Sequence, residues 1–319
     1  MTDSIDRRGL LKGAAAIAGA WALVGRHKAA GAAEPASRAA EETGVTSYDF
    51  GSCIWVRVEG RVFTCYRAEA TQKYPCFYPV IGPASGLPMT DETALPYPHH
   101  RSLFLGCDHV NGGNYWQEAL ARGQIASRGP KTEKTGNDRA VITDQCDWRQ
   151  PGQPTIIQDS RQFTITAPSA DCRIIDADIT LTAKADINIT KTNHSFFSLR
   201  AARELAPLGG GTLVNANGQT GEKETFGQVA RWCGYYGTRL GVAESIVLMD
   251  HPGNPFPRRP WFTRDYGFIS PTPFYWLDEQ GWRLPAGQSI RVRYRVVASK
   301  GKIAADEMNQ LHTEWAGKA

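Results

Sequence analysis

The stretch Arg173-Ile174-Ile175-Asp176-Ala177-Asp178-Ile179-Thr180-Leu181-Thr182 decides the fold class of this chain. From Ile175 onward its apolar and polar side chains alternate, which is the pattern of a β-strand with one buried face. A second stretch near the C-terminus alternates in the same way and carries a charged face, Ile290-Arg291-Val292-Arg293-Tyr294-Arg295-Val296-Val297. Both stretches predict strands of an antiparallel sheet.

Strand signals continue through most of the chain. Residues 54–58 and 62–66 flank Glu59-Gly60-Arg61 and predict a hairpin. Residues 74–81 predict a strand whose Pro75 and Pro79 suit a sheet edge. Further strands are predicted at residues 140–147, 154–159, 162–167, 187–190, 195–200, 245–249 and 266–269. One amphipathic helix is predicted at residues 302–315, and the whole pattern indicates an all-β antiparallel sandwich.

The first residues resemble an export signal. Arg7 and Arg8 precede an apolar run at residues 13–24 and small residues at 29–33, the order found in twin-arginine signal peptides. We expect residues 1–32 to be this signal, 33–46 a flexible tether and 47–319 a single domain, in a periplasmic or secreted protein. The alternative is an uncleaved N-terminal anchor, although the apolar run is short for a membrane span.

Charge and cysteine content narrow the class of protein. The 319 residues include 36 Lys and Arg against 32 Asp and Glu. Residues 1–32 hold five of the basic and two of the acidic side chains, which leaves the rest of the chain at +1. We therefore expect no nucleic-acid partner, and no membrane span after removal of the signal. The seven cysteines include no CxxC pair, and at least one thiol must stay unpaired within a monomer.

One segment concentrates most of the candidate chemistry. Residues 96–116 read Pro-Tyr-Pro-His-His-Arg-Ser-Leu-Phe-Leu-Gly-Cys-Asp-His-Val-Asn-Gly-Gly-Asn-Tyr-Trp. Histidine can serve as general acid or base near neutral pH, and arginine can bind a carboxylate or an oxyanion. On an extended chain adjacent histidines point to opposite sides, so at most one of His99 and His100 faces a given cleft. The alternative is that these groups only hold the loop in shape. The polar candidates are His99, His100, Arg101, Asp108, His109, Asn111 and Asn114.

A second polar segment follows the apolar residues 246–249. Polar groups at the end of a buried strand, and on the loop that follows it, are well placed for a site. The alternative is a structural network between Arg264 and Asp265, with His251 capping a turn. We predict that this segment and the first one form the two walls of one cleft. The candidate site residues of this second segment are Asp250, His251, Asn254, Trp261, Arg264 and Asp265.

A third group of residues gives weaker evidence for a site. His194 precedes a predicted strand, and Trp232 follows a polar loop at residues 209–218. Exposed aromatic rings stack on sugar faces, whereas Asn, Asp and Arg side chains bind sugar hydroxyls. The alternative for Trp232 is a core position, which is the more frequent place for such a ring.

Metal binding is a separate question. Several residues could supply ligands, but none has the HExxH spacing on a helix. The chain also lacks GxGxxG, P-loop and GxSxG motifs. The cofactor is therefore left unassigned, with a divalent metal as one option. The residues that could supply metal ligands are His99, His100, Asp108, His109, His194 and His251.

The two main segments together resemble the DUF6807 family, often labelled "PmoA family" or "methane oxygenase-like". The resemblance spans residues 48–299. It rests on Pro98-His99-His100-Arg101-Ser102-Leu103, on residues 108–116, on Asp250-His251-Pro252-Gly253-Asn254-Pro255, and on Trp261 with Arg264-Asp265-Tyr266-Gly267. Many members read His-Gly-Asp-Val-Asn-Gly where this chain has Cys107-Asp108-His109-Val110-Asn111-Gly112, so the acid is displaced by one residue. The label is misleading, because the true methane monooxygenase subunit spans the membrane several times. The resemblance implies an exported β-sandwich that is often encoded near sugar oxidoreductases and glycoside-degrading proteins.

These observations predict an exported carbohydrate-active enzyme on a β-sandwich comparable to the galactose-mutarotase or lectin-type supersandwiches. It would be a glycoside hydrolase, lyase or epimerase, and its partner would be a small-molecule or oligosaccharide substrate. The alternatives are a non-catalytic carbohydrate-binding or scaffold protein and a metal-dependent oxidoreductase. The catalytic candidates are His100, His109, Asp250 and His251. The substrate-binding candidates are His99, Arg101, Asp108, Asn111, Asn114, His194, Trp232, Asn254, Trp261, Arg264 and Asp265.

Overall fold

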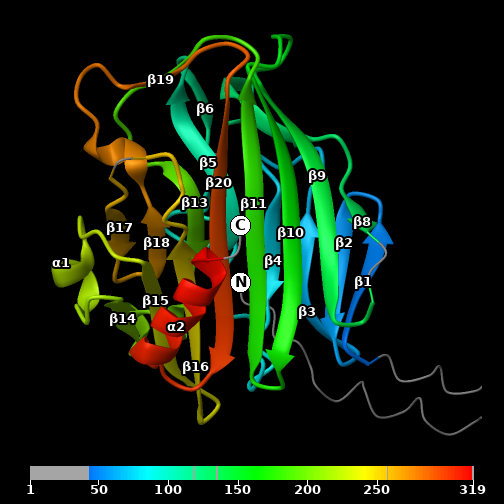
Figure 1. The fold of residues 1–319 in the computed structure, drawn as a ribbon, viewed down its shortest axis with the longest axis vertical. Helices are drawn as coiled ribbons and strands as arrows, with labels where there is room; N and C mark the ends of the chain where they lie inside the picture. The colour runs from blue at the N-terminus through cyan, green and yellow to red at the C-terminus, as the bar shows by residue number, and fades with distance from the viewer. Residues whose placement is uncertain (1–42, 118, 134–135, 257, 318–319) are drawn as a thin grey trace, which may run out of the picture. The chain divides into compact units, whose positions relative to one another are not determined.

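A computed structural model describes residues 43–117, 119–133, 136–256 and 258–317. The expected signal at residues 1–32 and most of the expected tether lie outside these residues, and the first strand, β1, begins at Val45. The strands form two sheets in which every pairing is antiparallel (Figure 1). The predicted all-β antiparallel sandwich is confirmed.

The first sheet has eleven strands. Its order is β1-β2-β3-β4-β5-β13-β18-β17, β6 pairs with β5, and β12 pairs with both β5 and β19. The bounds are β1 (Val45–Phe50), β2 (Cys53–Val58), β3 (Arg61–Arg67), β4 (Cys76–Val80), β5 (Leu103–Val110), β6 (Gly113–Tyr115), β12 (Ile187–Ile189), β13 (Ser195–Arg200), β17 (Trp261–Arg264), β18 (Phe268–Pro271) and β19 (Trp282–Leu284).

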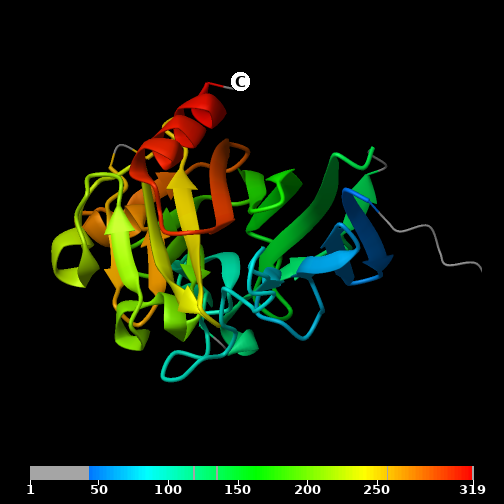
Figure 2. The same cartoon turned by 90° about the horizontal axis from the view of Figure 1, so that it is seen from below.

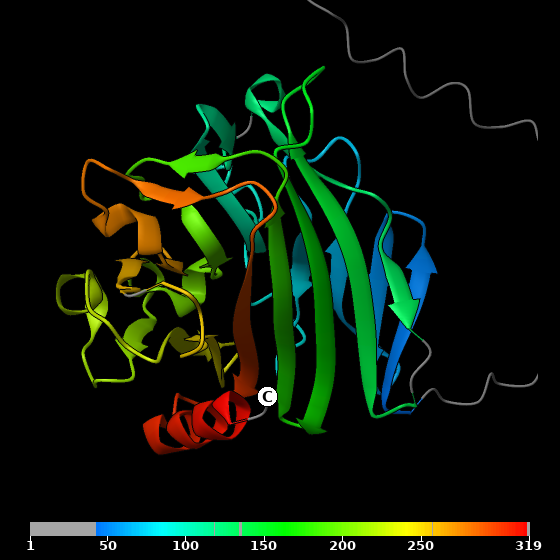
Figure 3. The ribbon, with the colours of Figure 1, turned by 45° about the horizontal axis from the view of Figure 1, so that its top comes forward.

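The second sheet has nine strands in the order β14-β15-β16-β20-β11-β10-β9-β7, with β8 paired to β9. Its long central strands lie side by side in Figure 3. The bounds are β7 (Gln124–Ser127), β8 (Lys131–Glu133), β9 (Arg139–Arg149), β10 (Ile157–Ser169), β11 (Cys172–Ala183), β14 (Thr212–Asn215), β15 (Trp232–Arg239), β16 (Val242–Asp250) and β20 (Ser289–Lys300).

Helical structure is scarce, as the sequence predicts. The C-terminal helix α2 spans Ala305–Ala316, close to the predicted residues 302–315. In the part of the chain that the structure describes, the helices are too short or too polar to cross a lipid bilayer. The other helical elements are α1 (Gly221–Thr225) and the 3₁₀ turns η1 (Leu120–Arg122), η2 (Arg203–Leu205), η3 (Pro207–Gly209) and η4 (Pro273–Trp276).

The core lies between the two sheets. Tyr66 of β3 and Phe77 of β4 face Phe163 of β10 across it, with ring centres 5.1 and 4.8 Å apart. Further along, Phe197 of β13 stacks on Tyr294 of β20 at 4.8 Å. These contacts join strands of opposite sheets, so aromatic packing and apolar burial hold the sandwich together.

Helix α2 covers one end of the outer face of the nine-stranded sheet (Figure 2). Met308 and Trp315 of the helix form an apolar cluster with Ile174 of β11 and Val297 of β20. Alternate residues of a strand share a face, so Asp178 of β11 lies further along this same outer face. The outer face is therefore apolar where α2 covers it and polar where it does not.

Two predictions about strands are wrong in detail. Residues 157–159 and 162–167 belong to one strand, β10, and the prediction split it because Asp159 and Arg161 occupy inward positions and interrupt the apolar alternation. They pair with each other there, at 2.7 and 2.8 Å. The strand with Pro79 is not at an edge, since β4 lies between β3 and β5. Pro79 is tolerated because it falls where the register of β3 and β4 shifts.

Candidate functional site

The pairing of β5 with β13 brings Asp108 and His194 together. Cys107 pairs with Ser195 in this antiparallel ladder, so the residue after Cys107 lies opposite the residue before Ser195. The His194 carbonyl oxygen accepts the Asp108 backbone N–H at 3.1 Å. The His194 Nδ1 and the Asp108 Oδ2 are 2.7 Å apart. Two residues far apart in sequence thus form a histidine–carboxylate pair.

Asp108 is held in place by its surroundings. Its side chain is buried, and the Thr192 hydroxyl donates to Oδ1. The same Thr192 hydroxyl oxygen accepts the His194 backbone N–H at 3.0 Å. A carboxylate fixed in this way orients the imidazole and favours the tautomer with a proton on Nδ1. The other ring nitrogen, Nε2, is then the one that can exchange a proton with a bound molecule.

Aromatic rings fix the plane of His194. The Trp116 indole stacks on it with ring centres 5.3 Å apart. The His99 imidazole meets it nearly at a right angle, at 5.7 Å. His100 stacks on Phe268 at 4.1 Å. The expectation that adjacent histidines point to opposite sides of an extended chain is wrong, because the chain turns at residues 98–99 and the two imidazole centres lie 4.5 Å apart.

A polar pocket of about 320 Å³ lies beside the pair, which is within the range of small-molecule sites. The Lys191 ammonium lies 5.8 Å from the centre of the Tyr275 ring. The exposed His109 places its Nδ1 3.1 Å from the Lys191 carbonyl oxygen. The lining residues are Asp108, His109, Asn114, Gln117, Arg122, Lys191, Thr192, Asn193, His194 and Tyr275.

The two asparagines of the first segment mainly shape its turns. The Asn111 amide donates to the Asp186 carbonyl oxygen at 2.9 Å, and its Oδ1 accepts the Asn188 N–H at 2.7 Å. The Asn114 Oδ1 accepts two backbone N–H groups, those of Trp116 and Gln117, at 2.9 and 2.8 Å. For Asn111 the structure therefore supports the alternative that the side chain only holds the loop in shape, whereas Asn114 also lines the pocket.

His100 is buried and does not line the pocket. It is 3% exposed, and its Nδ1 has no hydrogen-bond partner in the described part of the chain. Burial, together with the charges of His99 and Arg200, lowers the pKa of His100 to about 2. An imidazole that stays neutral and closed off from solvent is poorly suited to general acid–base work. Arg101 places its Nη1 3.8 Å from the Glu92 carboxylate.

The second segment divides between two places. Tyr266 packs against Tyr97 and His100, with ring centres 4.9 and 6.1 Å apart. Asp250 and His251 lie instead under α2: the Asp250 carbonyl oxygen is 3.0 Å from the His312 Nε2, and His251 contacts Trp315 at 4.9 Å. The predicted two-walled cleft is therefore not formed, because neither Asp250 nor His251 lines the His194 pocket.

Asp250 belongs to a separate buried network. Its carboxylate accepts the Asn254 amide at 2.7 Å and the Arg259 guanidinium. Burial raises the pKa of Asp250 to about 6, against the opposing effect of Arg259. Burial also lowers the pKa of His251 to about 4. A pocket of about 200 Å³ borders this network beside His312.

The remaining candidates are structural. Arg264 bonds Glu222 at 3.0 Å and Asp265 accepts the Glu222 N–H at 2.8 Å, the kind of network foreseen as the alternative. Trp232 and Trp261 are fully buried, and each indole N–H has a partner within the protein. Neither ring can therefore stack on a sugar, because no face of it is open to solvent.

Sequence reasoning missed part of the pocket. Lys191 and Thr192 lie close to His194 in the sequence, and this proximity is the feature that could have indicated that they line the same pocket. Gln117, Arg122 and Tyr275 are brought in by loops around η1 and η4, and nothing in their local sequence marks them.

The described residues give no metal-ligand cluster and no disulfide. Within residues 43–117, 119–133, 136–256 and 258–317, no three His, Cys, Asp or Glu side chains gather closely enough to hold a metal ion. All seven cysteines are thiols in this structure.

Residues 53–313 match a family described as a family of unknown function, DUF6807. No curated protein matches the chain. A heparan sulfate lyase HepC mutant from Pedobacter heparinus is similar with a TM-score of 0.41 and 11% identity, over 86% of this chain and 38% of the lyase. A galactose 1-epimerase from Lactobacillus acidophilus NCFM is similar with a TM-score of 0.40 and 7% identity, over 82% of this chain and 100% of the epimerase. Likenesses this weak do not bear on activity.

Proposed function

The chain belongs to the DUF6807 family, and from this premise we propose that it is a carbohydrate-active enzyme that uses histidine acid–base chemistry. Since that family is described as one of unknown function, the proposal rests on the site itself. The observation that carries it is the His194–Asp108 pair, at 2.7 Å, beside a polar pocket of about 320 Å³.

The pair supports a proton-transfer role. With Asp108 holding the proton on Nδ1, the Nε2 of His194 can take a proton from a hydroxyl, a water or a carbon beside a carbonyl, and can return it to a leaving oxygen. His99, whose ring centre lies 5.7 Å from that of His194, does not line the pocket and acts by holding the His194 ring in place. Lys191 and Arg122 line the pocket where they can stabilise negative charge on an oxygen.

The lining of the pocket favours a hydroxyl-rich substrate. Amide groups of Asn114, Gln117 and Asn193 supply both donors and acceptors, and Tyr275 supplies a ring beside them. This combination fits a glycoside or an oxidised sugar, on which hydrolysis, elimination and epimerisation all need an acid and a base. The twin-arginine signal at Arg7 and Arg8 would place this activity in the periplasm or outside the cell.

The test is a screen of the purified mature protein against glycosides and 3-keto-glycosides, with and without chelator. On a substrate that turns over, His194→Gln should lower kcat about 100-fold to 10,000-fold. His312→Gln is the matched control, because His312 belongs to α2, faces Asp250 and does not line the pocket. Unchanged turnover in His194→Gln would refute the assignment, and saturable sugar binding without turnover would favour the binding-protein alternative.

A further inference from the structure

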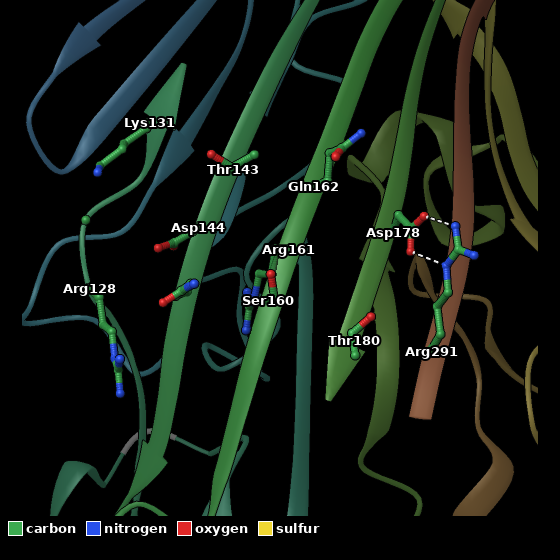
Figure 4. Close-up of a pocket in the computed structure, with 12 residues that line it drawn as sticks. Arg128, Lys131, Thr143, Asp144, Ser160, Arg161, Gln162, Asp178, Thr180 and Arg291 are labelled. Atoms are coloured by element: carbon green, nitrogen blue, oxygen red, sulfur yellow. Dashed lines mark hydrogen bonds and ion pairs between the residues drawn. The ribbon is translucent and has the colours of Figure 1, made fainter. Parts of the chain in front are cut away.

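A larger pocket lies on the other sheet. It occupies about 640 Å³ on the outer face of the nine-stranded sheet, where Thr143, Gln162 and Asp178 lie on neighbouring strands (Figure 4). It shares no lining residue with the His194 pocket. The lining residues are Arg128, Gly129, Lys131, Thr143, Asp144, Gln145, Ser160, Arg161, Gln162, Asp178, Thr180 and Arg291.

The strand register arranges the polar side chains of this pocket as a grid. Gln162 of β10 pairs with Thr143 of β9 on one side and with Asp178 of β11 on the other. Two residues away, Ser160 lies between Gln145 and Thr180 in the same manner. Neighbouring strands are about 4.8 Å apart, so hydroxyl and amide groups recur at short, regular intervals. A chain molecule with many hydroxyls can meet such a grid at several points.

Two bidentate ion pairs border the grid. Arg128 donates to both oxygens of Asp147 at 2.8 Å, and Arg291 donates to both oxygens of Asp178 at 2.8 and 2.5 Å. These arginines are already neutralised, so the pocket has no strong field for a polyanion such as nucleic acid. Lys131 of β8 makes no ion pair with any residue that the structure describes. Its ammonium places a positive charge at the β8 side, whereas the Asp144 carboxylate of the lining is buried and accepts hydrogen bonds from hydroxyl groups.

The carboxylates of the pocket already have partners within the protein. Its buried residues are internally satisfied: Asp144 accepts Tyr66 and Ser127 hydroxyls at 2.9 and 2.8 Å, and Arg161 is paired with Asp159. No histidine and no aromatic ring line it. The occupant must therefore be recognised by hydrogen bonds and one charge, without ring stacking.

We propose that this pocket is a second, non-catalytic binding site for a short acidic oligosaccharide. The sugar hydroxyls meet the Thr143, Ser160 and Gln162 side chains, and an anionic group on the sugar meets Lys131. Volume separates this site from an ordinary solvated sheet face, since about 640 Å³ lies in the middle of the range for ligand pockets. The site goes beyond the proposed activity, because it needs no turnover and shares none of its residues.

The test is calorimetric titration of the full chain with tri-galacturonate, tri-mannuronate and tri-guluronate. At least one should bind saturably. Lys131→Ala should weaken that binding about tenfold, the effect of one lost charged hydrogen bond. Gln162→Ala should weaken it several-fold. Gln158→Ala is the matched control, because Gln158 lies on the same face of β10 but outside the lining set.

The methyl ester of the bound trisaccharide measures how much the anionic group contributes to binding. Esterification removes the anionic group and leaves the hydroxyls, so it should weaken wild-type binding and abolish the effect of Lys131→Ala. His194→Gln should bind like the wild type. The proposal is overturned if none of the three probes binds, or if Gln158→Ala weakens binding as much as Gln162→Ala. It is also overturned if His194→Gln is the only variant that weakens binding. These results are independent of the turnover screen, so the two proposals can fail separately.

Discussion

His100→Phe is expected to make folding less sensitive to acid. The new ring keeps the stacking position on Phe268, where the two ring centres are now 4.1 Å apart. It also removes the buried Nδ1, which has no hydrogen-bond partner among the described residues. At neutral pH the variant should be as stable as the wild type or slightly more stable, because a buried unsatisfied polar atom is lost without leaving a cavity.

The size of the acid effect follows from the pKa of His100, which burial lowers to about 2. In the unfolded chain a histidine has a pKa of about 6.5. The folded state therefore binds the proton less tightly, and the stability that neutral His100 contributes is complete above pH 6.5 and declines as the pH falls towards 2. Each pH unit below 6.5 costs a little over 1 kcal/mol, so at pH 4.5 the wild type should have lost about 3 kcal/mol through this residue.

Urea unfolding followed by tryptophan fluorescence at pH 7.5, 6.5, 5.5 and 4.5 measures this effect. The difference in unfolding free energy between His100→Phe and the wild type should widen by about 3 kcal/mol between pH 7.5 and 4.5. As the pH falls, protonation of His251 also lowers the free energy of unfolding, whereas protonation of Asp250 raises it. Both groups titrate in the wild type and in the variant alike, so their effects cancel in the difference. A difference that stays constant across this range would refute the reasoning.

Three further changes test other parts of the structure. Asp108→Asn should lower kcat at least tenfold with little change in KM, since the amide no longer fixes the tautomer of His194; equal kinetics on an identified substrate would contradict a role for the pair. Trp315→Ala should lower the free energy of unfolding by about 3 kcal/mol in urea titration, because the apolar cluster between α2 and the sheet loses one of its two tryptophans; a loss well below 1 kcal/mol would show that the helix is not docked there. Asp159→Leu should cost about 3 kcal/mol by the same measurement, because it leaves the buried Arg161 guanidinium and the Trp148 indole N–H without their acceptor. Adding Arg161→Met should recover the part that is due to Arg161, and no recovery would contradict a role for the ion pair.

The fold class could be predicted because most strands have one buried and one polar face. β11 and β20 show this alternation clearly, and both were predicted almost to their ends. β5 does not alternate, because it is buried on both faces along nearly its whole length. β15 was missed because Gly234 and Gly237 interrupt its pattern; a Cβ at Gly234 would lie 2.7 Å from the Ile246 carbonyl oxygen, so the close approach requires glycine.

The candidate site could be predicted only in part. Residue type correctly marked Asp108, His109 and His194 as polar groups near a pocket. Their arrangement depends on the register between β5 and β13, and a shift of one residue would turn Asp108 to the opposite face. Nothing local to either strand specifies that register. Asp250 and His251 looked equally suitable by type, but the packing of α2 takes them elsewhere.

The division of the outer sheet face has a consequence for solubility. A chain that ended after β20 would leave Ile174, Val247 and Val297 uncovered as neighbours on adjacent strands. Contiguous apolar surface of this kind promotes self-association and aggregation. Helix α2 therefore protects this apolar surface from self-association, and we expect truncated forms of the protein that lack α2 to aggregate.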